Sequence, residues 1–548
     1  MTFRKPTIRN SAVLLFAALL AAPLVLPQDA SAKIGFARVG KIGRGPAMRH
    51  GPAGTVIRGP GKVVDRAPVK TVSRGPVRDP GRGRDGGGGG GGLIGVGTGI
   101  AITQPPGGGL PPPGGFVPPG ASGPAGGSPP NGPNQNANAG GGGGGSSGVP
   151  PAGERRFVPD EVVIEIPNSV SAATITAMAR RHRLERLGSQ PVALLNTTFY
   201  RWHIPNQRSV ATVIRALEAD GRVASAQPNY LYRLQQAQPA EANAAPAGAA
   251  GATAGSASAS PREGDPAQYA VPKMRLPEAH GIAKGDNVLV AVIDSGVDQS
   301  QPELAGAIAG SFDTLKPPFT PHAHGTAIAA LIAGHSRLMG SAPSARILAV
   351  HAFDPAGSTA EATTFNILKG LDWSVAQHAR IINMSFAGPA DPAIHRALEA
   401  AHKKDVVLIA AAGNAGAKSP PLYPAADPNV IAVTATDASD QLFDGSNRGR
   451  HIAVAAPGVD ILIAVPNGGY EVSTGTSYSA AEVSGIAALM LQRKGDLTPD
   501  AVRDTLLATA KDLGKKGRDD DFGAGLADAY RAVTELPGSR VSDAVPAK

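Results

Sequence analysis

Residues 288–294 read VLVAVID, six apolar residues followed by Asp294. A short continuous apolar run is typical of a strand that is buried on both faces of a parallel sheet. The chain after it carries five more strand candidates, at 347–350, 381–384, 406–411, 430–433 and 452–455, and all but one of them are continuously apolar. Segments with a helical pattern lie at 325–333, 364–378, 393–402 and 477–491. This alternation predicts an α/β fold with a doubly wound, mostly parallel sheet covered by helices on both faces.

The predicted α/β domain fills residues 266–535 of a 548-residue chain, and residues 536–548 are expected to form a disordered tail. The 71 Gly and 50 Pro are unevenly spread and are concentrated before residue 155. Residues 33–155 therefore contain too little apolar surface to fold, and we predict a disordered, basic Gly/Pro/Arg-rich segment there.

The net charge of +9 belongs to this segment, because residues 33–85 hold thirteen Lys and Arg against three Asp. Two interpretations stay open. The segment is either an arm that makes weak contacts with an anionic surface through 33–85, or a solvated spacer. No specific nucleic-acid binding is predicted from it.

The first residues have the pattern of an export signal. Arg4, Lys5 and Arg9 are basic, residues 12–26 are apolar, and residues 30–32 read ASA. This pattern predicts a signal peptide at 1–32, and the apolar run is shorter than the ~20 residues that a membrane span needs. We therefore expect a secreted or periplasmic protein. The chain has no cysteine, which excludes disulfides, a cysteine nucleophile and thiolate zinc ligands.

Residues 156–235 predict a second, smaller domain. The order is strand, helix, two strands, helix and strand in about 80 residues, which is the order of a ferredoxin-like α+β unit. An apolar run at 162–166 opens it, and Val210, Val213, Ile214 and Leu217 fall on one helix face. Residues 236–265, rich in Ala, Gly, Ser and Pro, then predict a linker with an accessible processing site.

Two residues with acid–base chemistry stand at the ends of predicted elements. Asp294 follows the first strand of the α/β domain, although an isolated Asp-Ser-Gly is equally typical of a turn aspartate bonded to its own backbone. His324 opens the helical stretch HGTAIAALIAG, where it is either a fixed imidazole or a capping or packing residue.

Two further polar residues stand at similar places. Ser477 lies in GTSYSAAEVSGIAALML, at the start of an apolar helix whose free N–H groups favour a developing anion; a helix N-cap is the alternative. Asn414 ends VVLIAAAGN, and its side-chain amide can donate to an oxyanion. Functional residues in doubly wound sheets gather at the carboxyl ends of the strands. Together with the two residues above, these predict a Ser-His-Asp triad with an Asn oxyanion donor.

The motifs at 294–296 (DSG), 324–326 (HGT), 411–414 (AAGN) and 475–477 (GTS), in this order, resemble those of the subtilisin-like serine peptidases (subtilases). The resemblance covers roughly 266–535 and includes GSAPSA at 340–345 and NMSF at 383–386. Residues 156–235 are similar to the inhibitory propeptide of that family. The resemblance implies a subtilisin-like fold and a serine endopeptidase that is made as a self-inhibited precursor and acts on proteins or peptides. It also implies that an extended peptide binds to backbone groups of four residues: Ser385, Phe386, Ala387 and Gly413.

The chain departs from the family pattern beside the predicted nucleophile. The family commonly has Met-Ala-x-Pro-His after Gly-Thr-Ser, where this chain has Tyr-Ser-Ala-Ala-Glu at 478–482, and it commonly has His at the position of Ala327. No triad member is changed, so the packing below the nucleophile is expected to differ. Two alternatives to an enzyme are a non-catalytic binding protein that keeps the fold and an envelope-adhesive protein that uses its basic arm.

The predicted chemistry needs no cofactor. The resemblance leaves structural calcium open, because the family often binds it and three successive acids, Asp519, Asp520 and Asp521, could contribute ligands. A solvated acidic loop explains these residues equally well, so no metal site is assigned.

Overall fold

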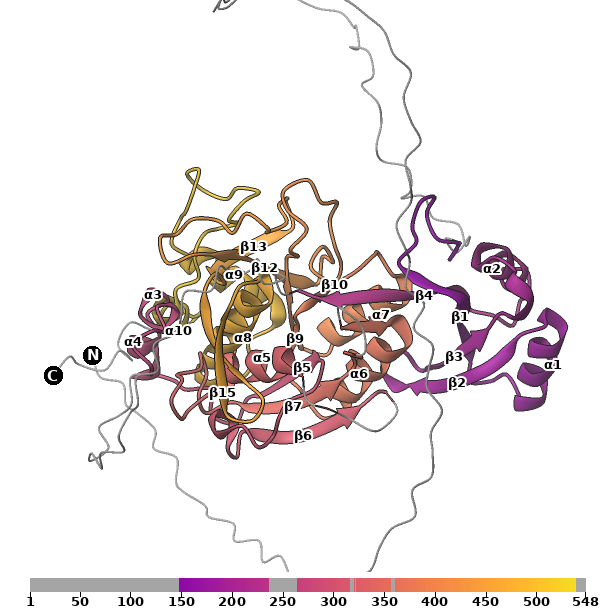
Figure 1. The fold of residues 1–548 in the computed structure, drawn as a ribbon, viewed down its shortest axis with the longest axis horizontal. Coiled ribbons are helices and arrows are strands. Elements are labelled where there is room, and N and C mark those ends of the chain that lie inside the picture. The colour runs from indigo at the N-terminus through magenta and orange to yellow at the C-terminus, as the bar shows by residue number, and fades with distance from the viewer. Residues whose placement is uncertain (1–146, 236–263, 316–319, 321, 356–359, 539–548) are drawn as a thin grey trace, which may run out of the picture. The chain divides into compact units, whose positions relative to one another are not determined.

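The computed structural model describes residues 147–235, 264–315, 320, 322–355 and 360–538 (Figure 1). The predicted signal peptide, most of the Gly/Pro-rich segment and of the linker, and the last ten residues lie outside them. Residues 147–155 do belong to the described part, and there Ser147 Oγ and Gly148 N donate to the Glu218 carboxylate. Within these ranges no helix is both long and apolar enough to cross a membrane.

A seven-stranded sheet forms the centre of the larger domain, and every neighbouring pair in it is parallel. The strand order is β13-β12-β11-β9-β5-β7-β6. The strands are β5 (Leu289–Asp294), β6 (Ile308–Asp313), β7 (Arg346–His351), β9 (Ile381–Met384), β11 (Val407–Ala411), β12 (Val430–Thr436) and β13 (Ile452–Pro457). The predicted doubly wound sheet is confirmed. The sequence missed β6, because this edge strand is only half-buried and lacks a continuous apolar run.

Helices cover both faces of this sheet (Figure 1). α5 (Ala323–Ala333) and α8 (Thr476–Arg493) share one buried cluster with the sheet, whereas α6 (Thr364–Ala376) and α7 (Pro392–His402) share the other. α8 is buried on all sides from Thr476 to Leu491, as expected of a helix with small and apolar residues all round. The remaining elements are α3 (Ala270–Lys273), α4 (Leu276–His280), α9 (Pro499–Thr509), α10 (Ala529–Thr534) and the hairpin of β14 (Ile461–Val465) and β15 (Gly469–Ser473).

The smaller domain has the predicted strand and helix order, and its sheet is antiparallel with the order β4-β1-β3-β2. Its elements are β1 (Phe157–Pro167), α1 (Ala172–His182), β2 (Glu185–Val192), β3 (Thr197–His203), α2 (Val210–Glu218) and β4 (Ser225–Leu234). The two helices pack on a core that includes Met178, Trp202 and Ile214.

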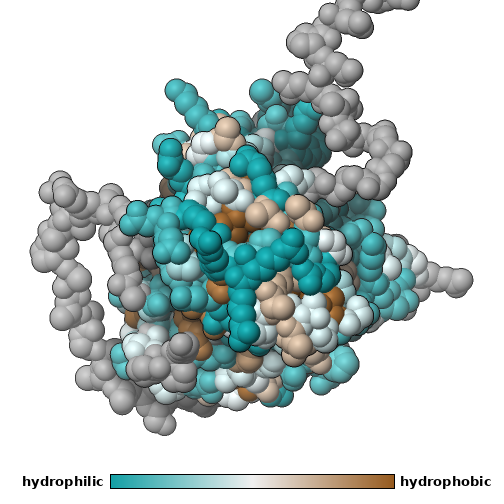
Figure 2. Space-filling view, turned by 90° about the vertical axis from the view of Figure 1, so that its right-hand side faces the viewer, coloured by the Kyte–Doolittle hydropathy of each residue, from teal (hydrophilic) through white to brown (hydrophobic). Residues whose placement is uncertain are grey.

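The face of the molecule in Figure 2 is mostly hydrophilic, with small separate hydrophobic patches.

β4 belongs to both domains. It pairs with β1 inside the smaller domain. Its last residues also pair antiparallel with β8 (Glu361–Thr363) on one side and with β10 (Phe386–Ala387) on the other. The end of the smaller domain therefore lies as a central strand between two strands of the larger one.

The core of the smaller domain is expected to depend on Trp202, which is fully buried. Trp202→Ala should destabilise this domain by about 3–5 kcal/mol, because it leaves a large cavity in a small core. Limited trypsin digestion followed by mass spectrometry should then find faster cleavage within 157–234. Leu187→Ala, at a side chain that is half exposed, is the control and should leave the cleavage rate near wild type.

Candidate active site

Asp294 and His324 form a buried pair at the carboxyl edge of the sheet. The Asp294 oxygens Oδ1 and Oδ2 lie 2.8 and 2.9 Å from His324 Nδ1. Ser295 N also donates to Asp294 Oδ1 at 2.7 Å, so the carboxylate holds both its own turn and the imidazole. Because Nδ1 faces the carboxylate, Nε2 is the nitrogen left for other chemistry. His324 Nε2 is buried and has no hydrogen-bond partner among the described residues.

The local sequence fixes His324 at the start of α5. His322 is the N-cap, and its Nδ1 accepts from His324 N at 3.3 Å. A Cβ at Gly325 would lie only 2.1 Å from Gly296 O, so a glycine is needed for α5 to approach the turn after β5. The imidazole is thereby brought against the carboxylate.

Ser477 lies in the first turn of α8, and it is not the N-cap. Gly475 occupies the cap position, and the Ser477 Oγ is buried with no partner in the described part of the chain. The next residue, Tyr478, lies with its ring centroid 6.0 Å from that of His324. The hydroxyl is therefore on a turn that packs against the imidazole, and hydrogen bonds in such sites are often long until substrate binds.

The Asn414 side chain is held beside the same turn. Its Oδ1 accepts hydrogen bonds from Thr476 N at 3.1 Å and from Thr476 Oγ1 at 2.8 Å. This leaves the amide Nδ2 buried and without a partner in the residues that the structure describes. Asn414 thus carries a fixed N–H donor next to the residue that precedes Ser477.

The predicted peptide-binding residues lie along β4. Phe386 and Ala387 pair with Leu234 and Arg233, and Ser385 O accepts from Gln235 N at 3.1 Å. Gly413 differs, because its N–H donates to Thr476 Oγ1 and its carbonyl accepts from Asn447 N. Three of the four predicted residues therefore contact the end of the smaller domain, and Gly413 bonds within the larger one.

Residues 285–525 match the family model described as the subtilase family, and residues 145–229 match the one described as the fervidolysin N-terminal prodomain. The chain is 36% identical to subtilisin E of Bacillus subtilis over 275 residues, which is 48% of this chain and 71% of that protein. The chain belongs to the subtilase family. It is a subtilisin-like serine endopeptidase with an N-terminal prodomain, and the match to that prodomain covers the smaller domain described above as far as the middle of β4.

Two other relatives extend this comparison. The subtilase is 35% identical over 270 residues to the minor extracellular protease Epr of Bacillus subtilis, which is 48% of this chain and 41% of Epr. The crystal structure of fervidolysin from Fervidobacterium pennivorans, a keratinolytic enzyme, aligns with a TM-score of 0.56 at 23% identity. That alignment covers 70% of this chain and 62% of fervidolysin, and it establishes the shared fold.

The prodomain of the subtilase also caps two helices of the catalytic domain. Asn229 Oδ1 accepts from Phe365 N in α6, and Gln227 Oε1 accepts from Ala393 N in α7. Asp391, the N-cap of α7, accepts from Gln227 Nε2 at 2.7 Å and from Thr364 Oγ1 at 2.6 Å. Burial raises the pKa of Asp391, and these hydrogen bonds lower it in part. Nothing in the sequence predicts these contacts, because Gln227 and Asn229 resemble ordinary strand residues.

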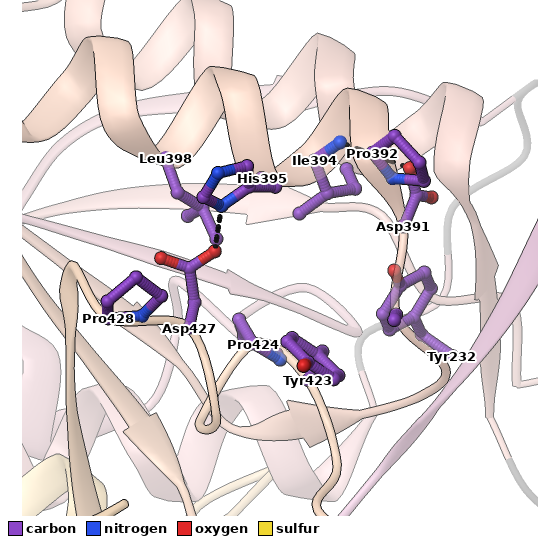
Figure 3. Close-up of a pocket in the computed structure, with 11 residues that line it drawn as sticks. Tyr232, Asp391, Pro392, Ile394, His395, Leu398, Tyr423, Pro424, Asp427 and Pro428 are labelled. Carbon is purple, nitrogen blue, oxygen red and sulfur yellow. Dashed lines mark hydrogen bonds and ion pairs between the residues drawn. The ribbon is translucent and has the colours of Figure 1, made fainter. Parts of the chain in front are cut away.

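A pocket of about 370 Å³ adjoins β4 (Figure 3). Tyr232 lies at one end of it, and a hydrogen-bonded pair lies at the other, with His395 Nδ1 2.6 Å from Asp427 Oδ2. Side chains of Ile394 and Leu398 from α7 supply apolar surface between them. The pocket therefore begins where an aromatic side chain of the prodomain enters the catalytic domain.

The three successive acids do not form a metal cluster. Asp519 accepts hydrogen bonds from the backbone N–H groups of Lys515, Asp521 and Phe522. Asp521 pairs with Arg448 at 3.3 Å. Across the described ranges, no group of three or more His, Asp or Glu side chains is placed to hold a metal. The question of structural calcium stays open, and no step below depends on it.

Tyr232 is expected to hold the prodomain in place, because it is fully buried against Phe386, with ring centroids 5.8 Å apart. Tyr232→Ala should weaken docking by about 2 kcal/mol or more, as for other buried aromatic anchors. Hydrogen-exchange mass spectrometry of the full chain should show faster exchange in the peptides that contain β8 and β10. Arg233→Ala, on the same strand but with an exposed side chain, is the control and should change this exchange much less.

Proposed function

We propose that the subtilase hydrolyses peptide bonds through Asp294, His324 and Ser477, with Asn414 as the oxyanion donor. One observation carries this proposal. Three buried polar atoms lie around the turn at 475–477, and none of them has a hydrogen-bond partner among the described residues. They are His324 Nε2, Ser477 Oγ and Asn414 Nδ2. Unsatisfied buried polar atoms are costly to a fold, so their presence together indicates groups reserved for a substrate.

The proposed reaction is acyl transfer. Ser477 Oγ attacks the carbonyl carbon of the peptide while His324 Nε2 takes the hydroxyl proton, and Asp294 stabilises the resulting imidazolium through Nδ1–H. Asn414 Nδ2 and the Ser477 N–H, which lies in a first helical turn without an intrahelical acceptor, donate to the oxyanion. The imidazolium then protonates the leaving amine, which leaves an acyl-enzyme. Water attacks this ester with His324 again as the base, and the peptide acid is released.

The precursor is proposed to inhibit itself. β4 pairs with β8 on one side and with β10 on the other. Extended peptides bind to open sheet edges by adding a strand in this way, so β4 takes the place of a substrate. Gln235 follows it, with its N–H on Ser385 O and its side-chain Oε1 accepting from Asn414 N. These contacts support the peptide bond after Gln235 as the processed bond and residues 156–235 as an intramolecular inhibitor. The linker that follows lies outside the described residues.

The substrates proposed are proteins or peptides that bind in extended form. By analogy with β4, Gln235 takes the first position before the cut bond and Tyr232 the fourth. A Cβ at Gly388 would lie 2.4 Å from the Tyr232 ring, so the glycine makes room for an aromatic side chain. The pocket in Figure 3 adjoins this position, and departure of the prodomain would open it towards the substrate.

Export to the periplasm or the medium is proposed from residues 1–32, which lie outside the described residues. The similarity to a protease that is named extracellular supports this location. Mass spectrometry of the N-terminus before and after processing tests both boundaries, since export predicts a form that starts at Lys33 and processing a form that starts at Gln236. A contact of residues 33–85 with anionic surfaces also falls outside the described residues and is retained only as a proposal.

Removal of the nucleophile should stop both turnover and processing. Ser477→Ala is expected to lower kcat by about 10⁶-fold, and Asn414→Ala by about 100- to 1,000-fold. The measurements are hydrolysis of a quenched peptide that contains the 232–236 sequence YRLQQ, and the size of the purified chain. Ser479→Ala, which removes a nearby hydroxyl bonded to Ala456 O, is the matched control and should still be processed. Processing of the Ser477→Ala chain at the wild-type rate, with no other protease present, would rule out self-cleavage.

The fourth substrate position should depend on Gly388. Gly388→Ala is expected to reduce kcat/KM for the YRLQQ peptide at least tenfold more than for ARLQQ, because the added methyl group meets the aromatic ring and not the alanine. Steady-state kinetics on the two peptides measures this ratio. Equal losses on both peptides would show that the subsite does not receive this side chain.

A further inference from the structure

A second buried acid lies on α8 and takes no part in the proposed reaction. Glu482 is only 3% exposed, and its Oε2 accepts a hydrogen bond from the Ser341 hydroxyl. Burial raises the pKa of Glu482 to about 8, and the bond from Ser341 offsets this only in part. It forms no ion pair with any residue that the structure describes. The carboxyl group is therefore mostly protonated at neutral pH.

Ser341 is firmly attached to α5, the helix that begins at His324. Ser341 N donates to Leu331 O at 2.9 Å, and Ala342 N donates to Ile332 O at 2.7 Å. The same segment touches α8 directly, because a Cβ at Gly485 would lie 2.3 Å from Ser341 Cβ. The bond between Ser341 and Glu482 therefore joins the helix of the imidazole to the helix of the nucleophile.

Few ionisable side chains face this bond. The strands β9, β11, β12 and β13, which pack against α8, carry none. β5 and α5 carry Asp294 and His324, which pair with each other. α10 carries Tyr530 and Arg531, of which Arg531 pairs with Glu535.

Two more titratable groups come from segments that precede the sheet. His280 Nε2 lies 3.0 Å from Ser341 O, and burial lowers its pKa, which favours the neutral imidazole. Tyr269 donates to Val459 O at 2.6 Å. Its pKa is raised by its own burial and, to a smaller extent, by nearby acids that include Glu482. Burial and the Ser341 hydroxyl, with no charged partner among the described residues, therefore set the environment of Glu482, which suits a neutral acid better than an anion.

We propose that Glu482 is a positioning residue that holds α8 against α5 while it is protonated, and that loss of its proton loosens the alignment of Ser477 with His324. This inference rests on the proposed nucleophile and base. The deprotonated Glu482 carboxylate would have no cation beside it among the described residues. It would therefore draw water into the contact between α5 and α8. Alkaline pH would then lower kcat while the peptide-binding strands stay intact.

The inference is tested with the processed enzyme and the YRLQQ peptide between pH 6 and pH 10. Wild-type kcat should be roughly tenfold lower at pH 9 than at pH 7, as expected when the active form is the one that binds the proton. Glu482→Gln, which is neutral at every pH and still accepts from Ser341, should lose less than twofold over the same interval. Glu399→Gln, at an exposed acid on α7 that pairs with Lys403, is the control and should keep the wild-type profile.

Ser341→Ala gives an independent test if Glu482→Gln does not fold. It removes the hydroxyl that favours the charged form, so the alkaline loss should move to higher pH, and kcat at pH 7 should fall with KM unchanged. If the Glu482→Gln enzyme had the wild-type dependence of kcat on pH, this inference would be overturned, but the proposed function would not. A wild-type chain with no peptidase activity at any pH would overturn the proposed function and this inference together.

Thermal unfolding separates positioning from stability. The folded-state pKa lies above the ordinary value of 4.5, so the stability that the protonated group provides is present in full below pH 4.5 and is lost as pH rises towards 8. Both chains are measured in the Ser477→Ala background. The Tm of the Glu482→Gln chain minus the Tm of the chain with Glu482 should therefore be larger at pH 8 than at pH 5. An equal difference in Tm at both pH values would contradict a buried, protonated carboxyl group.

Discussion

The structure depends on the parallel direction of its seven central strands, because this direction brings their carboxyl ends to one edge. β5 ends in Asp294 at this edge, and Asn414 follows β11. α5 and α8 both begin near it, which brings His324 and Ser477 to the same place. Four chemical groups that are far apart along the chain are thus collected by backbone hydrogen bonding, and glycine at 325 allows the final close approach.

Much of this could be predicted from the sequence, because each site residue ends a continuous apolar run or opens a helix. The boundaries of β9 agree with the prediction, and those of α5 and α8 differ from it by at most two residues at either end. The partly exposed strands β6 and β15 were missed because they lack such runs, whereas β14 is a continuous and mostly buried apolar run, ILIAV, that was overlooked.

The contacts between the two domains were beyond prediction for a different reason. Gln227 and Asp391 are separated by 164 residues, and nothing in the local sequence of either one indicates a partner. The pairing of β4 with β8 and β10 likewise needs three segments that are distant along the chain. The departure at Glu482 was visible in the sequence, whereas its partner Ser341 was not. Local sequence patterns predict individual helices and strands, but they do not predict contacts between segments that are distant along the chain.

The buried acids Asp294, Asp391 and Glu482 differ in their hydrogen-bond partners. Asp294 is paired with the imidazole of His324. Asp391 and Glu482 are held by hydroxyl or amide donors and no cation, and burial raises the pKa of both. A neutral carboxyl group is less costly to bury than a carboxylate, and this favours the protonated form at Glu482.

The sharing of β4 between two sheets has a consequence for the timing of activation. A cut after Gln235 would sever one covalent bond but would leave every backbone ladder around β4 in place. The severed inhibitor would stay seated, and the slow event would be its escape or its digestion. The first molecules to become free would digest the inhibitors of their neighbours, so activity would rise late and then abruptly in a crowded population.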